Sequence, residues 1–248
     1  MMRWTLIAIL ALTTVVAPPA LADPPDRLLE PSLHLQASTD SAAPRVALTL
    51  DACGGSTDLR ILDALVENRV AATIFVTGVW LKRNPEAFAT MRAHPDLFEI
   101  GDHGARHVPA VDRPVHVYGL KAAGSPAAVK AEVELGSVAI IKNGGSKPRW
   151  FRGATAKYST GAIRIIHDLG YEVAGYSLNG DGGSLLGQKT TTARIAGAKD
   201  GDVILAHINQ PRHAAGSGVV AGVLALKARG FTFVRLSDVK PQGLPSGT

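Results

Sequence analysis

The run RVALTL at positions 45–50 is followed at once by DACGG at positions 51–55. Short runs of β-branched and aliphatic residues are typical of buried strands. Six further runs of this kind occur at positions 72–77, 97–101, 149–152, 171–177, 203–206 and 231–236. Segments with helical spacing lie between them, and this alternation predicts parallel strands joined by helical crossovers. We therefore expect residues 45–240 to form one α/β domain, either an irregular barrel or a doubly wound sheet.

Helices are predicted from spacing and from end signals between the strands. Proline in the first turn indicates a helix start, and glycine marks a helix end because it accepts the left-handed conformation. The first predicted helix has Leu59, Leu62 and Leu65 on one face, and the second begins at Asn84-Pro85. The third runs from Ser125-Pro126 to Asn143-Gly144. The fourth runs from near Ser159 to Gly170 and places Ile163, Ile166 and Leu169 together.

The composition excludes several classes of protein. With 46% hydrophobic and 19% charged residues, most of the 248-residue chain is not disordered. The 26 glycines and 15 prolines imply many loops and exclude a coiled coil or a helical bundle. A single cysteine excludes an intramolecular disulfide and a cysteine-based zinc or iron–sulfur cluster. The net charge of +5 is diffuse, without the lysine and arginine runs that follow a nucleic acid.

The first 22 residues have the features of an export signal. Arg3 supplies a positive charge, residues 5–16 form an apolar run, and Ala20-Leu21-Ala22 is a small-residue cleavage site. An uncleaved membrane anchor is the alternative, but the run is shorter than the ~20 residues that cross a bilayer. We therefore expect a periplasmic or secreted protein that begins at Asp23 and has no stable membrane insertion after cleavage.

Two further segments flank the predicted domain. Residues 23–44 are proline-rich and polar without sustained periodicity, which is typical of a tether or of an arm laid on the surface. Residues 241–248 are expected to form a C-terminal tail.

Polar residues gather at the ends of the predicted strands. Loops that leave the carboxyl ends of parallel strands converge, so catalytic groups collect there whatever the chemistry. We expect these residues to share one concave face. They are Asp51 and Cys53 after the first strand, Asp102, His103 and His107 after the third, Arg152 at the end of the fourth, Asp181 beyond the fifth, and His207 at the end of the sixth.

Three of these histidines are candidates for chemistry. His103 and His107 are four residues apart, a spacing that places both imidazoles on one side of a helical turn and suits one divalent ion. Imidazole ligation favours zinc, with cobalt or nickel as alternatives. His207 could act as a general acid or base, because its proton exchanges near neutral pH. An ordinary structural histidine is the alternative in each case.

Four motifs resemble those of the polysaccharide deacetylases, also called the NodB-homology group or carbohydrate esterase family 4. They occur in the family's order and approximate spacing over about residues 45–240. The motifs are Thr49-Leu50-Asp51-Ala52-Cys53-Gly54, His103-Gly104-Ala105-Arg106-His107, Phe151-Arg152-Gly153 and Leu205-Ala206-His207. The resemblance implies a distorted (β/α) barrel of about seven parallel strands. It also implies a hydrolase that removes acetyl groups from N- or O-acetylated carbohydrates with a divalent metal and a water nucleophile.

The resemblance assigns expected roles residue by residue. The expected roles are Asp51 as the catalytic base, His103 and His107 as metal ligands, Arg152 as the arginine that pairs with the base, Asp181 as the carboxylate beside the acid, and His207 as the catalytic acid. An acetylated glycan is the expected substrate. Trp80 and Trp150 are candidates for stacking on sugar rings, although core packing is the expectation for both.

The first motif departs from the family pattern. The family has two consecutive aspartates, of which the second ligates the metal, but Ala52 stands in the second place and Cys53 where glycine is usual. Alanine cannot ligate, so a metal would use the two histidines with waters, recruit Asp51 or Asp58, or be absent. Cys53 is expected to be a small buried residue beneath the site, and a thiolate nucleophile is the alternative.

Three functions follow from these residues. The favoured one is an exported, metal-dependent carbohydrate deacetylase. Ala52 supports a catalytically inactive glycan-binding module, and Cys53 supports a cysteine-dependent amidase. We favour the deacetylase because a mere binding site does not require a base, its arginine partner and an acid together.

Overall fold

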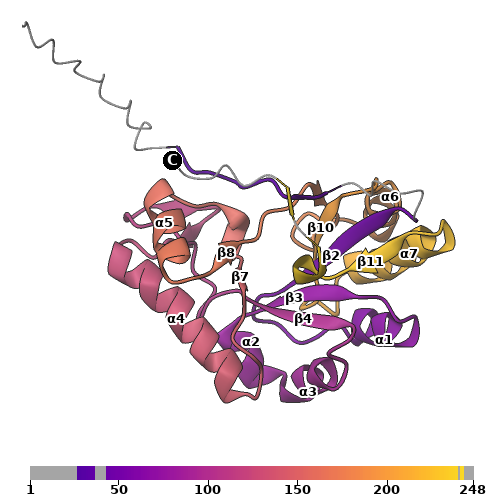
Figure 1. The fold of residues 1–248 in the computed structure, drawn as a ribbon, viewed down its shortest axis with the longest axis horizontal. Helices are drawn as coiled ribbons and strands as arrows, with labels where there is room; N and C mark the ends of the chain where they lie inside the picture. Colours follow the sequence, from indigo (N-terminus) through magenta and orange to yellow (C-terminus); the bar gives the residue numbers. More distant parts are fainter. Residues whose placement is uncertain (1–26, 37–42, 240, 243–248) are drawn as a thin grey trace, which may run out of the picture.

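The computed structural model describes residues 27–36, 43–239 and 241–242 (Figure 1). The expected signal segment 1–22 lies outside these residues, and of the expected tail 241–248 the structure describes residues 241–242, which form a strand. The strands are β1 (His34–Leu35), β2 (Arg45–Ala52), β3 (Ala72–Val76), β4 (Phe98–Asp102), β5 (His116–Val117), β6 (Leu120–Lys121), β7 (Trp150–Phe151), β8 (Glu172–Val173), β9 (Leu178–Asn179), β10 (Val203–His207), β11 (Thr232–Val234) and β12 (Pro241–Gln242). The α-helices are α1 (Leu59–Glu67), α2 (Gly78–Arg83), α3 (Pro85–Ala93), α4 (Pro126–Lys142), α5 (Thr160–Asp168), α6 (Gln188–Ala196) and α7 (Ala215–Ala228).

The central sheet is parallel and curls into a distorted barrel. Its order is β8-β7-β4-β3-β2-β10-β9, and β11 pairs with the first residues of β2. Every strand pair in this sheet is parallel. The predicted α/β barrel of about seven parallel strands is therefore confirmed, and all seven predicted strands are present. The two-residue strand β9 and the helices α2, α6 and α7 were not predicted, and neither were the two-residue strands β1, β5, β6 and β12 outside this sheet.

The register of the strands brings their polar ends to one edge of the sheet. Asp51 in β2 pairs with His207 at the end of β10. Asp102 at the end of β4 pairs with Phe151 at the end of β7. Because neighbouring strands are in parallel register, the residues that follow these pairs are adjacent in space.

The two faces of β2 have different surroundings. Val46, Leu48, Leu50 and Ala52 pack with apolar side chains of the surrounding helices in the main core. The intervening residues point to the inner face of the curled sheet, because successive side chains of a strand alternate. This alternation is what directs Asp51 into the barrel.

One predicted helical face is partly wrong. Leu59 opens α1 but is 56% exposed, whereas Ile61, Leu62 and Leu65 are buried. The expected helix starts at Pro85 and Pro126 and the expected end at Gly170 are confirmed. Gly170 has φ +83°, the left-handed conformation for which glycine is favoured.

The described part of the N-terminal segment lies against the domain. The backbone of Leu29 exchanges two hydrogen bonds with Tyr158, and β1 pairs antiparallel with β12. Leu33 and Leu35 are buried in a cluster with apolar side chains of the inner face of the barrel. Residues 27–36 thus cover apolar surface that the sheet alone leaves open.

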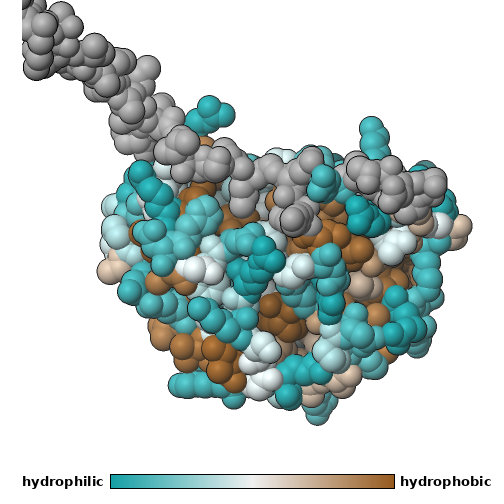
Figure 2. All heavy atoms as spheres, viewed as in Figure 1, coloured by the Kyte–Doolittle hydropathy of each residue, from teal (hydrophilic) through white to brown (hydrophobic). Residues whose placement is uncertain are grey.

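Figure 2 shows that the visible surface is largely hydrophilic, with apolar side chains gathered over α4. The exposed large apolar side chains of that helix are Leu135, Val138 and Ile141. In the described part of the chain, no helix combines the length and the apolar character needed to cross a membrane.

Candidate active site

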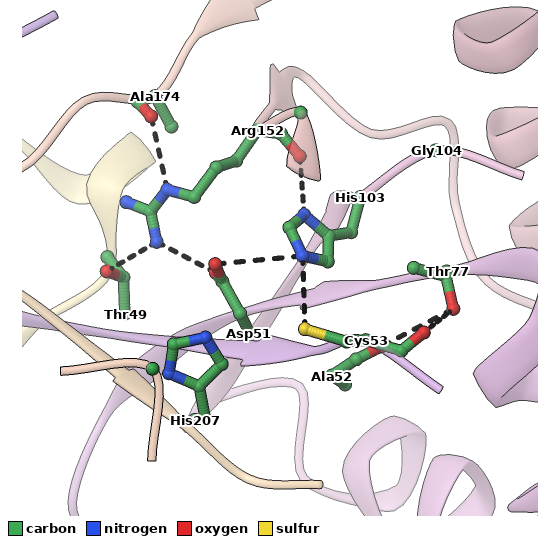
Figure 3. A network of polar contacts seen from close by, with 12 residues as sticks. Thr49, Asp51, Ala52, Cys53, Thr77, His103, Gly104, Arg152, Ala174 and His207 are labelled. Carbon is green, nitrogen blue, oxygen red and sulfur yellow. Dashed lines mark hydrogen bonds and ion pairs between the residues drawn. The ribbon is translucent and has the colours of Figure 1, made fainter. Parts of the chain in front are cut away.

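A buried ion pair joins Asp51 to Arg152 (Figure 3). Arg152 Nη1 donates to Asp51 Oδ1 at 3.0 Å and to Thr49 Oγ1 at 2.8 Å. Its Nε and Nη2 donate to the carbonyls of Ala174 and Gly175 at 3.1 and 2.9 Å. The guanidinium therefore has one fixed orientation, and its charge is compensated although it is fully buried.

The surroundings of Asp51 favour its ionised form. Burial alone would raise the pKa of its carboxyl, but the positive charges of His103, Arg152 and His207 lower this pKa below its usual value. An ionised carboxylate that lines a pocket, as Asp51 does, can accept a proton from a water molecule.

A second carboxylate holds His207. The backbone N–H of His207 donates to Asp181 Oδ2 at 2.7 Å, and Nδ1 lies 3.0 Å from Asp181 Oδ1. Burial alone would lower the pKa of His207, but Asp181 and Cys53 raise it well above the usual value. Because Nδ1 carries the proton that Asp181 accepts, Nε2 is the ring atom on the pocket side.

A backbone carbonyl orients the ring of His103. Its Nδ1 donates to the carbonyl of Arg152. The other ring nitrogen, Nε2, then lies 3.5 Å from Cys53 Sγ and 3.7 Å from Asp51 Oδ2. Burial would raise the pKa of the Cys53 thiol, but hydrogen bonding and charge from the neighbouring imidazoles lower it well below its usual value.

His107 joins His103 through a loop, and the expected helical turn is absent from this segment. Residues 103–107 are non-helical, with φ +85° at Gly104 and +64° at His107. The two rings still meet edge to face, with centroids 5.0 Å apart. The prediction that both imidazoles lie on one side is thus correct, but its structural reason is wrong.

Glu132 on α4 fixes this loop and was not among the residues predicted for the site. Its buried carboxylate accepts the backbone N–H groups of Arg106 at 2.8 Å and Val108 at 3.1 Å, on either side of His107. The available signal was a carboxylate among the buried apolar residues of a predicted helix, where an unpaired charge is costly.

Cys53, His103 and His107 form a group with metal-ligand chemistry. Each offers one ligand atom, and these atoms lie within 4.8 Å of one another. Two imidazoles and a thiolate are a donor set that suits zinc. The expectation that Cys53 is a buried space-filling residue is wrong, because it is partly exposed and lines the pocket.

Two other carboxylates lie apart from this group. Asp58 caps the N-terminus of α1 and pairs with Arg60, whose Nε lies 2.8 Å from its Oδ1, so the suggested recruitment of Asp58 as a ligand does not fit. Asp102 is fully buried beneath the histidine loop, where its Oδ1 accepts the N–H of Gly104 at 2.8 Å. Its expected place on the concave face is therefore wrong.

The site opens into a pocket of about 640 Å³, a size that accommodates a small ligand or one or two sugar rings. Asp51, Cys53, His103, His107 and His207 line it, while Arg152 and Asp181 are bonded behind them. The structure thus brings all six predicted catalytic and metal-binding residues into one connected site.

The rim of the pocket consists of residues that the sequence analysis did not single out. Tyr118, at the tip of the β5–β6 hairpin, is 75% exposed, and Leu185 is 79% exposed. Glu30 from the N-terminal segment also lines the pocket and pairs with Lys157 at 2.8 Å. Trp80 and Trp150 are fully buried, which confirms their expected place in the core.

Known structures share this fold. Bacillus subtilis PdaA, a family 4 carbohydrate esterase, has 21% identity over 85% of each chain and a TM-score of 0.66. A family 4 carbohydrate esterase of Streptomyces lividans in complex with acetate has 20% identity over 78% of this chain and 93% of its own, with a TM-score of 0.62. At these identities the likeness concerns the fold alone.

A pseudoenzyme of the same fold is also similar. The wild-type family 4 pseudoenzyme of Bacillus anthracis has 19% identity over 79% of this chain and a TM-score of 0.63, and the match covers 65% of its length. A mutant of that pseudoenzyme has restored enzymatic activity. No curated protein matches the sequence significantly.

The family itself is shown by the sequence. The family model for polysaccharide deacetylase matches residues 38–174, more than half of the 248 residues, and includes Asp51, both paired histidines and Arg152. The chain therefore belongs to the polysaccharide deacetylase family, whose members are hydrolases of amide or ester bonds in acetylated sugars.

Proposed function

We propose that the protein is an exported, metal-dependent deacetylase of an N- or O-acetylated carbohydrate. One observation carries this proposal: an arginine-paired carboxylate, an aspartate-paired imidazole and a cluster of metal-ligand atoms line the same pocket. The export signal expected in residues 1–22 and the family's acetylated substrates support the remaining parts.

Asp51 is suited to be the base. Arg152 keeps its carboxylate ionised and fixes Oδ1, so that Oδ2 can accept a proton from an attacking water. A divalent ion held by His103 and His107 would polarise the acetyl carbonyl and make a nearby water more acidic.

His207 is suited to be the acid. Its Nδ1–H donates to Asp181, which stabilises the protonated ring and points Nε2 toward the pocket. When the tetrahedral intermediate collapses, Nε2 can protonate the departing amine or alkoxide, and acetate and the free sugar group are released.

The test is acetate release from a panel of glycans with zinc supplied. The panel contains chitin-like oligomers, peptidoglycan fragments and O-acetylated polysaccharide, and chelator-treated protein is the control. We expect release from at least one of them. Binding of a glycan without release of acetate from any of them would overturn the proposal in favour of a binding module, the alternative that Ala52 and the similar pseudoenzyme support.

Tyr118 is expected to bind a sugar ring beside the site. Its exposed side chain stands at the pocket rim, so Tyr118→Ala should raise KM for an oligosaccharide about 2- to 12-fold and leave kcat unchanged. Tyr118→Phe keeps the ring and should retain the parental KM. Steady-state kinetics on an acetylated oligosaccharide and the acetylated monosaccharide check this, and an equal effect on both substrates would contradict it.

A further inference from the structure

We infer that the thiolate of Cys53 is the third protein ligand of the ion, in the place of the carboxylate that Ala52 cannot provide. The site is then a mixed site of one thiolate and two imidazoles. This inference rests on the proposed metal dependence and deepens it, because it names the ligand set and the class of metal.

The spacing of the donor atoms supports this ligand set. A tetrahedral zinc ion with Zn–S of ~2.3 Å and Zn–N of ~2.0–2.1 Å separates neighbouring sulfur and nitrogen ligands by roughly 3.6 Å. Cys53 Sγ lies 3.5 Å from His103 Nε2, and the group that includes His107 spans at most 4.8 Å. The three atoms thus need little movement to bind one ion.

The orientation of the donors points to a shared ion. Because the Arg152 carbonyl accepts the proton on Nδ1 of His103, Nε2 is the ring atom that faces the sulfur, and loss of its proton would free a lone pair there for an ion (Figure 3). Such an outer hydrogen bond is the usual means by which a protein orients a metal-binding imidazole. Glu132 fixes the backbone on either side of His107 by accepting the N–H groups of Arg106 and Val108.

The course of β2 explains why residue 53, and not residue 52, can supply the third metal ligand. Ala52 packs into the apolar core on the helix side of β2. Cys53 is two residues beyond Asp51 and lines the same pocket. The Thr77 hydroxyl donates to the Cys53 carbonyl and also caps α2, where it accepts from Trp80 N at 2.9 Å, so the backbone that carries the thiol is anchored.

A thiolate ligand leaves Asp51 available as the base. Oδ1 of Asp51 is occupied by Arg152, and a third ligand from Cys53 removes the need for Oδ2 to bind the ion. Three protein ligands with an open fourth position are typical of catalytic zinc. A soft thiolate also favours zinc or cobalt over magnesium or manganese.

The competing role for the thiolate is nucleophilic attack on the acetyl carbon. The two roles predict different effects when Cys53 is substituted. A ligand can be replaced by aspartate, whose carboxylate binds zinc and cobalt, whereas Cys53→Asp in a thioester mechanism removes the nucleophile. Cys53→Ser removes the strong ligand and keeps a residue of similar size.

The experiment is a titration of the metal-free full chain with Co²⁺, followed by absorption spectroscopy without substrate. Cys53 is the only cysteine in the sequence, so a sulfur-to-cobalt charge-transfer band reports this residue. We expect the band to saturate at one cobalt per chain. Cys53→Ser should lose the band and bind cobalt more weakly by at least the ~10–100-fold that loss of an outer-shell partner costs.

Cys53→Asp should bind cobalt without the band and more tightly than Cys53→Ser, because a carboxylate again supplies the third ligand. A parent protein without the band, or Cys53→Ser with unchanged cobalt affinity, would overturn the inference. So would an acetyl thioester on Cys53 of the parent protein, detected by mass spectrometry after incubation with an acetylated glycan. Circular dichroism confirms that each variant is folded. The parent with the band but without acetate release from any glycan would defeat the proposed function and leave the ligand set intact.

Discussion

Asp51→Asn should lower acetate release by about 10²–10⁴-fold, the range expected when a positioned base is lost. The amide cannot take a proton from water. Its oxygen can still accept a hydrogen bond from Arg152 Nη1, which lies 3.0 Å from Asp51 Oδ1 in the parent protein. The buried arginine therefore keeps a partner, and the fold should survive. Initial rates of acetate release from the best glycan, with zinc supplied, measure the effect.

Asp63→Asn is the matched control, because Asp63 is an exposed carboxylate on α1. It should retain the parental rate. A folded Asp51→Asn variant with the same rate as Asp63→Asn would show that Asp51 is not the base.

His207→Gln should lower the rate of acetate release by a factor that depends on the leaving group. On an N-acetylated sugar the departing amine needs a proton, and the rate should fall by about 10²–10⁴-fold. On an activated phenyl ester the leaving group departs without a proton, and the loss should be much smaller. Asp51→Asn should impair both substrates, because both need an activated water.

His167→Gln is the control for this pair of assays, since His167 is exposed on α5. It should behave as the parent on both substrates. If His207→Gln lost the same factor on the amide and on the activated ester, proton donation to the leaving group would not be its role.

The strands and their polar ends could be predicted from the sequence because a buried strand requires a short apolar run. The missed helices lack a comparable signal. Helix α7 contains Gly218 and Gly222, and glycine in a sequence indicates a break in a helix. In the structure, a Cβ on Gly222 would lie 2.6 Å from the Cβ of Ile195, so the glycine permits close packing of α7 on α6. Tertiary packing thus overrides local propensity there.

The sequence predicted which residues form the site, but it did not predict the local structure that holds them. The pairing of Asp181 with His207 follows from strand order, because β9 and β10 are adjacent. The loop of His107 depends on Glu132, which is 25 residues away in the sequence, and no local pattern reports such a contact. The expected helical turn failed for this reason.

Cys53 shows a different limit of sequence reasoning. A single cysteine excludes sites built from several cysteines, but it does not exclude a mixed site with histidines. Only the structure places its sulfur beside His103 Nε2. The absence of a carboxylate at Ala52 therefore does not leave the two histidines without a third donor.

Stepwise addition of zinc to the metal-free full chain, with acetate release measured at each step, tests metal-dependent deacetylation most directly. The rate should be negligible without zinc, rise in proportion to the zinc added and reach its plateau at one zinc per chain. Equal rates in the metal-free and the zinc-loaded protein would contradict it.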